Sequence, residues 1–451
     1  PMETSRVVGA AVAAAGAVAL TVWYLRRRAA GFASSSSSRV SDAKESEGLA
    51  RLAEQIQAPV HGKPEVLTPQ SVLAYFRRLP LTRPVAAESA ALTAEDSSTG
   101  NLNYCFVVKD GARKTSVFVK QAPDFVKCLG EDAKLTTERI RFEAQAALEF
   151  MKHAPGTVPD LFHFDATNCV MVMEHLAEYR LLNDDLIAEE VSSSAAQSIA
   201  VFMGRVHTAT HRQLVSSEGR EDYEKRFHNP ALCGITDTYI FTLPFIEDAS
   251  NSHTAGLDAR VAGIRADQQF LGDIKAVHKI YQTKKEALLH GDLHAGSIMT
   301  NGIDAKVIDH EFVFYGPAGF DLGLFVAGYV FPYAAAAAKG RDGTATAILT
   351  VLEGAVTQYL TLLKAARLPD ATVGEIFKDS LGFAGCELMR RVLGVAKRKD
   401  LEGIEDVPTK LRAENTVLNV GQSFVRACVG RESIATVEEM KAAIAGAGVL
   451  Q

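Results

Sequence analysis

The feature that most restricts the fold of this chain is a pair of short acidic segments that lie close together in the sequence. The first, HGDLHAGSIM, contains Asp292, and the second, VIDHEF, contains Asp309 and Glu311. Apolar runs at 287–289 and 305–308 flank the first segment, so we predict a strand–loop–strand hairpin that brings the carboxylates together. We also expect Asp309 and Glu311, two residues apart, to share one face of a strand.

Carboxylates in this arrangement suit phosphoryl transfer, which needs one at the acceptor hydroxyl and others that hold Mg²⁺ on the phosphates. Asp292 is the candidate for the first role, and Asp309 with Glu311 for the second. An isolated acidic pair is usually a solvated loop, but HGDLHAGSI followed by VIDHEFVFYGPAGFD is far more specific. We expect the histidines beside Asp292 to orient the loop by hydrogen bonds, and Asp321, in GFDLG, to anchor it or to cap a helix.

Length and composition set the broad class of the protein. With 451 residues, 47% of them hydrophobic, the chain can form two lobes with cores of their own. A net charge of −6 argues against a general nucleic-acid binder, and we expect no nucleic-acid partner. The six cysteines form no CxxC pair, which favours neither a zinc site nor a disulfide framework and indicates a reducing compartment.

The N-terminal stretch differs from the rest, because residues 7–25 carry no charge. As a helix this stretch would be about 28 Å long, close to the thickness of a bilayer core. Trp23 and Tyr24 end it and three arginines follow, which predicts a retained single-pass anchor at residues 1–30. The large domain would then lie on the positive side: matrix, cytoplasm or stroma. A cleaved signal peptide or a transit segment is the alternative.

The remaining pattern predicts an α+β, two-lobed, protein-kinase-like fold after a linker at residues 31–66. A strand-rich lobe is expected at 67–176 and a helical lobe at 177–451. Helices are expected at residues 71–78, 137–151, 195–210, 275–287, 344–366, 373–397 and 411–429. Strands are expected at residues 104–108, 116–121, 158–164 and 169–173.

Within the strand-rich lobe, several residues are candidates for nucleotide binding. Lys120 interrupts an apolar strand, where a lysine either points outward or serves as the cation for the phosphates. Glu143 on the following helix is its natural ion-pair partner, with Glu138 as the alternative. The expected contacts to the nucleotide are the loop residues Gly100, Asn101 and Asn103, and the hinge residues Glu174 and Leu176.

Two adjacent arginines, Arg390 and Arg391, form the other notable group. Paired arginines on a helix are normally a solvated face. Here apolar residues surround them in the sequence, so we expect both side chains to point into a site. Arginine forks suit an anionic or hydroxyl-rich ligand.

Taken together, these motifs resemble the 5-methylthioribose kinase family, within the aminoglycoside and choline kinase group. The resemblance covers residues 68–440 and includes GNLNYCF, VFVKQA, RIRFEA, HGDLHAGSIM, VIDHEFVFYGPAGFD and ELMRRVLGVAKRKDLEGIE. It implies ATP-dependent phosphorylation of the 1-hydroxyl of 5-methylthioribose, a step of methionine salvage. Asp292 would then be the base that also holds the sugar, Asp309 and Glu311 the Mg²⁺ ligands, and Lys120 the phosphate cation. Arg390 and Arg391 would contact the substrate or the transferring phosphate.

Some residues depart from the family pattern. His310 stands where proline is usual, Leu324 where asparagine is usual, and the hinge reads EHLAEY. The only tryptophan is Trp23, so the aromatic loop over the sugar is altered, and an anchor is unusual for this family. We therefore keep a second hypothesis: a kinase-fold accessory subunit of a membrane complex, such as a respiratory complex of the mitochondrial inner membrane. A protein kinase is disfavoured, because no DFG or APE segment is visible.

Overall fold

The computed structural model describes residues 52–448, except residues 58, 61–62, 82–83 and 99. It divides into two units, Pro1–Ala177 and Glu178–Gln451. The expected membrane anchor lies outside the described residues, as does most of the expected linker. The last part of that linker differs from expectation: residues 52–57 are helical, and Leu52 and Ile56 are buried in the core cluster that contains Ile140. Their spacing of four residues gives this short helix one apolar face.

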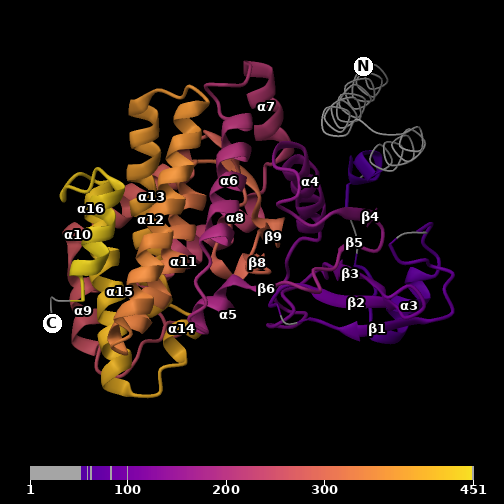
Figure 1. Cartoon of the computed structure of the whole chain (residues 1–451), viewed down its shortest axis with the longest axis horizontal. Coiled ribbons are helices and arrows are strands. Elements are labelled where there is room, and N and C mark those ends of the chain that lie inside the picture. Colours follow the sequence, from indigo (N-terminus) through magenta and orange to yellow (C-terminus); the bar gives the residue numbers. More distant parts are fainter. Residues whose placement is uncertain (1–51, 58, 61–62, 82–83, 99, 449–451) are drawn as a thin grey trace. The chain divides into compact units, whose positions relative to one another are not determined.

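The first unit is built on a five-stranded antiparallel sheet of order β1-β2-β3-β5-β4 (Figure 1). Its strands are β1 (Leu92–Asp96), β2 (Tyr104–Asp110), β3 (Thr115–Gln121), β4 (Leu161–Asp165) and β5 (Val170–Glu174). The two main helices of the unit are α3 (Pro69–Phe76) and α4 (Glu138–His153). Thr68 caps α3 through a capping box with Ser71, which explains why the helix starts there.

The two faces of this sheet have separate cores. Val117 and Val119 of β3 join the cluster that contains Phe76 of α3. Met171 of β5 joins the cluster that contains Ile140 of α4. Because side chains alternate along a strand, Lys120 faces away from the α3 cluster. The sheet thus turns this lysine toward α4.

The second unit is mostly helical, with two small sheets. Its larger helices are α6 (Ser193–Thr210), α7 (Ser217–Arg226), α9 (Asp258–Ala266), α10 (Gln268–Thr283), α11 (Gly319–Ala338), α12 (Asp342–Ala365), α13 (Asp370–Leu393), α15 (Val407–Cys428) and α16 (Val437–Gly446). Shorter helical segments are α5 (Leu182–Ile187), α8 (Pro230–Thr236), η1 (Asp237–Thr242), η2 (Leu243–Phe245), η3 (Ala295–Ser297), η4 (His310–Phe312) and α14 (Lys399–Glu402). The strands are β6 (Arg180–Leu181), β7 (Ala287–Leu289), β8 (Ile298–Thr300), β9 (Ala305–Val307) and β10 (Phe314–Gly316).

Helix α11 forms the centre of this unit and packs closely against α13. A Cβ atom on Gly323 would lie 2.7 Å from the carbonyl oxygen of Ser380, so the two backbones approach as near as glycine allows. Among the described helices, α11 and α12 are long and apolar enough to cross a membrane by length and composition alone. Burial of nearly all of α11 inside the unit is what a central core helix requires.

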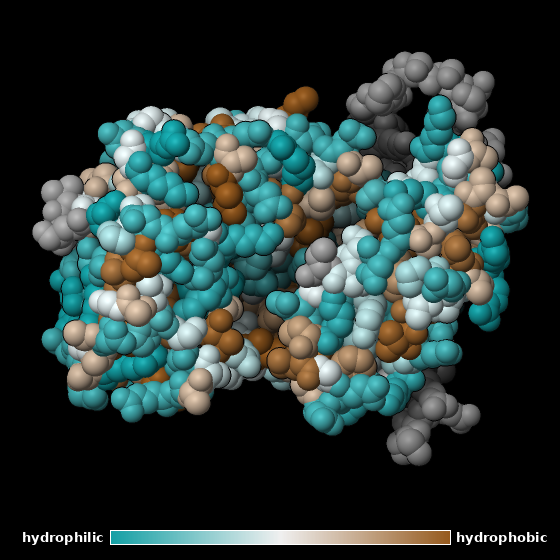
Figure 2. All heavy atoms as spheres, turned by 90° about the horizontal axis from the view of Figure 1, so that it is seen from below, coloured by the Kyte–Doolittle hydropathy of each residue, from teal (hydrophilic) through white to brown (hydrophobic). Residues whose placement is uncertain are grey.

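The observed elements follow most expected positions but correct one boundary. The helix expected at 275–287 runs from Gln268 to Thr283, and Ala287 instead begins β7. Helical periodicity could not separate the two, because the apolar residues at 287–289 continue the pattern of the helix. On the outer surface, exposed large apolar side chains are few and scattered among the described residues, and Figure 2 shows a largely hydrophilic face.

Candidate active site

Strand pairing in the second unit brings the two acidic segments together. Strand β7 pairs with β10, and β8 pairs with β9, in both cases antiparallel. Residues 290–297, which we call the Asp292 loop, connect β7 to β8. Residues 308–313, which we call the Asp309 loop, connect β9 to β10. The two loops therefore emerge from paired strands and lie side by side. The predicted hairpin between 287–289 and 305–308 is wrong in its pairing, because the unforeseen strand β8 takes β9 as its partner.

Direct contacts join these two loops. The Nε2 atom of His290 lies 2.8 Å from the carbonyl oxygen of Ile308, and the Ile308 N–H donates to the carbonyl of Ser297 at 3.0 Å. Gly291 has φ +84°, and a Cβ atom there would lie 2.1 Å from the carbonyl oxygen of Phe312. Only glycine allows this approach, because it has no Cβ and readily adopts a positive φ. The loops therefore form one interlocked structure.

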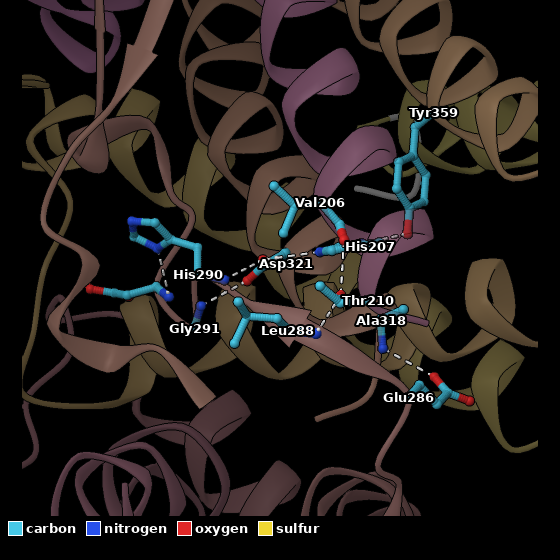
Figure 3. Close-up of polar contacts among 11 residues, drawn as sticks. Val206, His207, Thr210, Glu286, Leu288, His290, Gly291, Ala318, Asp321 and Tyr359 are labelled. Atoms are coloured by element: carbon cyan, nitrogen blue, oxygen red, sulfur yellow. Dashed lines mark hydrogen bonds and ion pairs between the residues drawn. The ribbon is translucent and has the colours of Figure 1, made fainter. Parts of the chain in front are cut away.

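Asp321, at the start of α11, anchors the Asp292 loop, which confirms one of the two roles expected for it (Figure 3). Its carboxylate accepts hydrogen bonds from the backbone N–H groups of His290, at 2.7 Å, and Gly291, at 2.9 Å. It also lies 3.3 Å from Nε2 of His207, whose Nδ1 is 2.8 Å from the Tyr359 hydroxyl. Burial alone would raise the pKa of Asp321, but the hydrogen bond from His207 helps to hold it below its usual value.

His294 supports the candidate base Asp292 within the same loop. The His294 N–H donates to the Asp292 carbonyl at 2.9 Å, and Nδ1 of His294 accepts from the Gly296 N–H at 2.9 Å. Burial lowers the pKa of the His294 ring to about 4, although the nearby Asp292 charge acts in the opposite direction. The ring is therefore neutral at pH 7 and carries its proton on Nε2. These contacts confirm that His290 and His294 orient the loop through hydrogen bonds.

The Asp309 loop carries the two candidate metal ligands, but in a conformation different from that predicted. Asp309 has left-handed backbone angles, φ 61° and ψ 57°, and Glu311 lies in the 3₁₀ helix η4. The expectation that both lie on one face of a strand is therefore wrong. Their chemistry fits Mg²⁺, which prefers carboxylate oxygens and usually takes one or two of them besides water and phosphate oxygens. No group of three or more His, Cys, Asp or Glu side chains among residues the structure describes could hold a metal.

Arg390 and Arg391 lie on α13 and share one carboxylate. Glu387 accepts from the Nε atoms of both arginines, in the case of Arg391 at 2.7 Å. Burial would raise the pKa of Glu387, but the two guanidinium groups lower it to about 2. The negative charges of Glu387 and Asp292 keep the pKa of Arg391 above its usual value despite burial. Arg390 is buried, the side chain of Arg391 is 10% exposed, and both lie within electrostatic reach of the candidate base. That they point into a substrate site stays a prediction.

A third arginine near this group was missed by sequence reasoning. Arg398 is only 6% exposed and donates to Asp400 at 3.1 Å and to the side chain of Asn183. Its guanidinium also lies 5.2 Å from the centre of the Phe331 ring. The only signal was the run KRKD after α13, which looks like a solvated charge cluster. Burial of Arg398 depends on Asn183, which is too distant in the sequence for the pattern to reveal.

In the first unit, the Lys120–Glu143 ion pair forms as predicted. The lysine Nζ lies 2.8 Å from Oε1 of Glu143, and both side chains are buried. The alternative partner, Glu138, instead accepts from Arg141 at 2.6 Å. This places a buried cation on β3, held by α4. Its contact with phosphates stays a prediction.

The loop that contains Gly100, Asn101 and Asn103, which we call the glycine–asparagine loop, is held by Arg139, another residue that sequence reasoning missed. Arg139 is fully buried and donates to Oδ1 of Asn103 at 3.2 Å and to the carbonyl of Leu102 at 3.2 Å. The carbonyl of Asn101 accepts from the Cys128 N–H at 3.0 Å, while Gly100 is exposed. The Asn103 side chain thus serves the loop itself.

The expected hinge residues lie at the end of this unit. The Glu174 N–H at the end of β5 donates to the carbonyl of Asp160 at 2.8 Å, and Leu176 is buried. The unit ends at Ala177, beside the expected lobe boundary after Leu176. The nucleotide contacts of Glu174, Leu176 and the glycine–asparagine loop stay predictions.

Known proteins with related sequences agree with this chemistry. Residues 100–349 match the APH phosphotransferase enzyme family. Methylthioribose kinase of Exiguobacterium sibiricum is 34% identical over 74% of this chain and 88% of its own length. Methylthioribose kinase of Bacillus pumilus is 31% identical over 80% of this chain and 93% of its own length.

A solved structure of Plasmodium vivax ethanolamine kinase is a more remote likeness, 13% identical with a TM-score of 0.43 over 81% of this chain and 94% of its own. The family match covers more than half of this chain, and the curated relatives cover about three quarters of it. The chain belongs to the APH phosphotransferase enzyme family and is an ATP-dependent small-molecule kinase that uses Mg²⁺.

Proposed function

We propose that this kinase transfers the γ-phosphoryl group of ATP to the 1-hydroxyl of 5-methylthioribose. The observation that carries the proposal is the Arg390–Arg391 pair on α13, which shares Glu387 within electrostatic reach of Asp292. A carboxylate beside two guanidinium groups can hold a sugar hydroxyl and also balance the negative charge that develops at the transferring phosphoryl group. The two methylthioribose kinases with 31% and 34% identity support the same substrate.

Each residue has a separate task in this reaction. Asp292 positions the sugar hydroxyl and receives its proton, while Asp321 holds the backbone of its loop and His294 orients its carboxylate. Asp309 and Glu311 would hold Mg²⁺, which neutralises phosphate charge and orients the γ-phosphoryl group. Lys120, held by Glu143, would bind phosphate oxygens of ATP. Arg390 and Arg391 would contact the substrate or the transferring phosphoryl group.

Two of the departures from the family pattern, Leu324 and His310, differ in where their side chains lie. Leu324 is fully buried in α11, so its side chain adds to the core of the unit. His310 is 3% exposed, and its ring meets the His290 ring edge-on with 5.3 Å between centroids. The change at His310 thus touches the Asp292 loop directly, and the change at Leu324 does so at most through packing.

The test is release of ADP from Mg-ATP by the full-length protein, with and without 5-methylthioribose. We expect sugar-dependent release in the wild type and its loss in Asp292→Asn. Asp304→Asn is the matched control, because Asp304 lies in the turn between β8 and β9 and its carboxylate accepts from the Tyr179 hydroxyl, outside the acidic loops. Ribose, which lacks the methylthio group, serves as the competing acceptor. Absence of sugar-dependent release in the wild type would contradict the proposal.

We further infer that residues 7–25 anchor this kinase in a membrane, with the mitochondrial inner membrane favoured. The support is the uncharged stretch itself and the arginines that follow it. The protein should stay in the membrane fraction after alkaline carbonate extraction, whereas a variant without residues 1–30 should be released. Release of both forms would contradict the anchor.

The same stretch, together with the departures from the family pattern, favours an accessory role in a membrane complex as the alternative. In that case, stoichiometric membrane subunits would co-purify with the protein in mild detergent, and turnover of 5-methylthioribose would be absent. Turnover by a protein that purifies without partners would contradict the accessory role.

A further inference from the structure

Asn229 connects a distant segment of the second unit to the Asp309 loop. It directly precedes α8 and is only 2% exposed. Its Nδ2 atom donates to the carbonyl oxygen of Glu311 at 2.9 Å and to that of Val313 at 3.1 Å. One side-chain amide therefore holds two backbone groups that lie more than eighty residues further along the chain.

These two carbonyl groups flank a third that is also fixed. The carbonyl oxygen of Phe312 lies where a side chain on Gly291 would have to go, so it packs against the Asp292 loop. Three consecutive carbonyl groups, from Glu311 to Val313, are thus held: the outer two by Asn229 and the middle one by Gly291. A change at Asn229 would remove the hydrogen bonds to the Glu311 and Val313 carbonyls and leave the packing of the Phe312 carbonyl against Gly291 in place.

The backbone of Asn229 is itself well fixed. Its carbonyl oxygen accepts from the Cys233 N–H at 3.1 Å, and Pro230 occupies the first turn of α8, where no N–H is needed. The carboxamide therefore projects from a rigid helix start. A rigid support of this kind is what places a coordinating side chain to within a fraction of an ångström.

We propose that Asn229 is a positioning residue for the divalent cation, acting through the backbone of Glu311. The inference rests on the proposed function, in which Asp309 and Glu311 bind the metal. By fixing the Glu311 carbonyl, Asn229 restricts the backbone angles from which the Glu311 carboxylate projects. Groups that orient metal ligands in this way typically change metal affinity by tenfold to a hundredfold when they are replaced.

The chemistry of the amide explains why asparagine is needed here. Nδ2 carries two hydrogens, and each of them meets one carbonyl oxygen. An ionised aspartate of the same shape has no hydrogen to donate and would place negative charge against both oxygens. Alanine would remove the two hydrogen bonds without adding charge. Both substitutions therefore remove the same two hydrogen bonds, but only the aspartate also adds a negative charge.

The chain offers a matched control in Asn251, whose Nδ2 donates to the carbonyl oxygens of Leu243 at 2.6 Å and Ile246 at 3.1 Å. Asn251→Asp thus breaks the same pair of bonds away from the acidic loops. We would measure the dissociation constant of Mn²⁺ by electron paramagnetic resonance on the full chain with ADP present. Asn229→Asp and Asn229→Ala should weaken Mn²⁺ binding at least tenfold, and Asn251→Asp should leave it unchanged.

The outcomes separate this inference from the proposed function. If both Asn229 variants bind Mn²⁺ like the wild type, or if Asn251→Asp weakens binding equally, the positioning role is overturned. Asp309→Asn marks the metal site, and its dissociation constant for Mn²⁺ should exceed that of every variant of Asn229 and Asn251. Turnover of 5-methylthioribose by the wild type is measured in a separate experiment. If 5-methylthioribose is not the substrate, the comparison of Mn²⁺ dissociation constants is still valid. In the Asn229 variants we expect the Mg²⁺ concentration for half-maximal turnover to rise by a larger factor than the factor by which the maximal rate falls.

Discussion

The ring of His294 lies against the carboxylate of Asp292, with 3.5 Å between Nε2 and Oδ2. Nδ1 of the ring accepts from a backbone N–H, so the Nε2 proton points to the carboxylate. A neutral donor in this position orients Asp292 while leaving its negative charge intact. The other charges that act on the ring are Arg391, Arg398 and Glu387. Because the pKa of the ring is about 4, His294 is neutral at pH values near 7.

This neutral histidine makes stability depend on pH in a defined way. The unfolded chain protonates His294 near its ordinary pKa of 6.5, while the folded chain does so only near 4, so its contribution to stability is lost as the pH falls between these values. The stability advantage of wild type over His294→Gln should therefore shrink by about 1–2 kcal/mol between pH 7.5 and pH 5. Urea denaturation at the two pH values measures it. A constant difference would show that the ring is not held neutral.

Gly291 and Gly302 provide a matched pair of substitutions. Both have a positive φ, +84° and +85°, but a Cβ on Gly291 would meet the Phe312 carbonyl, whereas nothing lies within 4 Å at Gly302. Gly302→Ala should cost about 1–2 kcal/mol of unfolding free energy and leave turnover unchanged. Gly291→Ala should lower turnover by at least about a hundredfold, because the interlocked loops must separate. Equal turnover in the two variants would mean that the loop contact is not needed for catalysis.

The Lys120–Glu143 pair allows stability and nucleotide binding to be separated. Lys120→Met leaves a buried carboxylate and should lower the unfolding free energy by about 3–5 kcal/mol, whereas Lys109→Met, in the exposed pair with Glu95, should cost at most about 1 kcal/mol. The double variant Lys120→Met, Glu143→Gln should recover most of the stability. It should not recover the KM for ATP, if Lys120 binds phosphates. Recovery of both would assign the lysine a structural role only.

Contacts were predicted correctly from the sequence where they join neighbouring elements whose apolar residues recur with a clear helical or strand period. Lys120 on an alternating strand and Glu143 on the next helix are such a case, and their ion pair forms. The anchoring of the Asp292 loop by Asp321 is another, because GFDLG follows shortly after the acidic segments in the motif. Both predictions needed only local geometry and complementary charge.

Prediction failed where the structure depends on distant partners or on unusual backbone angles. Strand β8 has three residues, too few to show alternation, so its pairing with β9 was not foreseen. The left-handed angles of Asp309 leave no trace in the residue pattern. The burial of Arg398 and the bonds of Asn229 both require segments far away along the chain. No single-sequence pattern carries that information.

Glu387 offers the sharpest test of the arginine pair. Its pKa of about 2 lies below its ordinary value of 4.5, so the stability that it contributes is present above pH 4.5 and is lost only as the pH falls toward 2. Glu387→Gln removes this charge from both arginines at every working pH. We expect kcat/KM for the sugar to fall at least tenfold, by a factor that stays constant from pH 6 to pH 9, since Glu387 does not titrate there.

Glu375→Gln is the control for this substitution, because Glu375 lies on the same helix, is exposed and lies only 3.7 Å from Lys284 as a loose surface pair. It should leave kcat/KM unchanged. Steady-state kinetics across the pH range distinguish the two variants. If Glu387→Gln matched the control, Arg390 and Arg391 would hold their positions without their shared carboxylate, and packing of α13 against α11 and α15 would have to be what orients them.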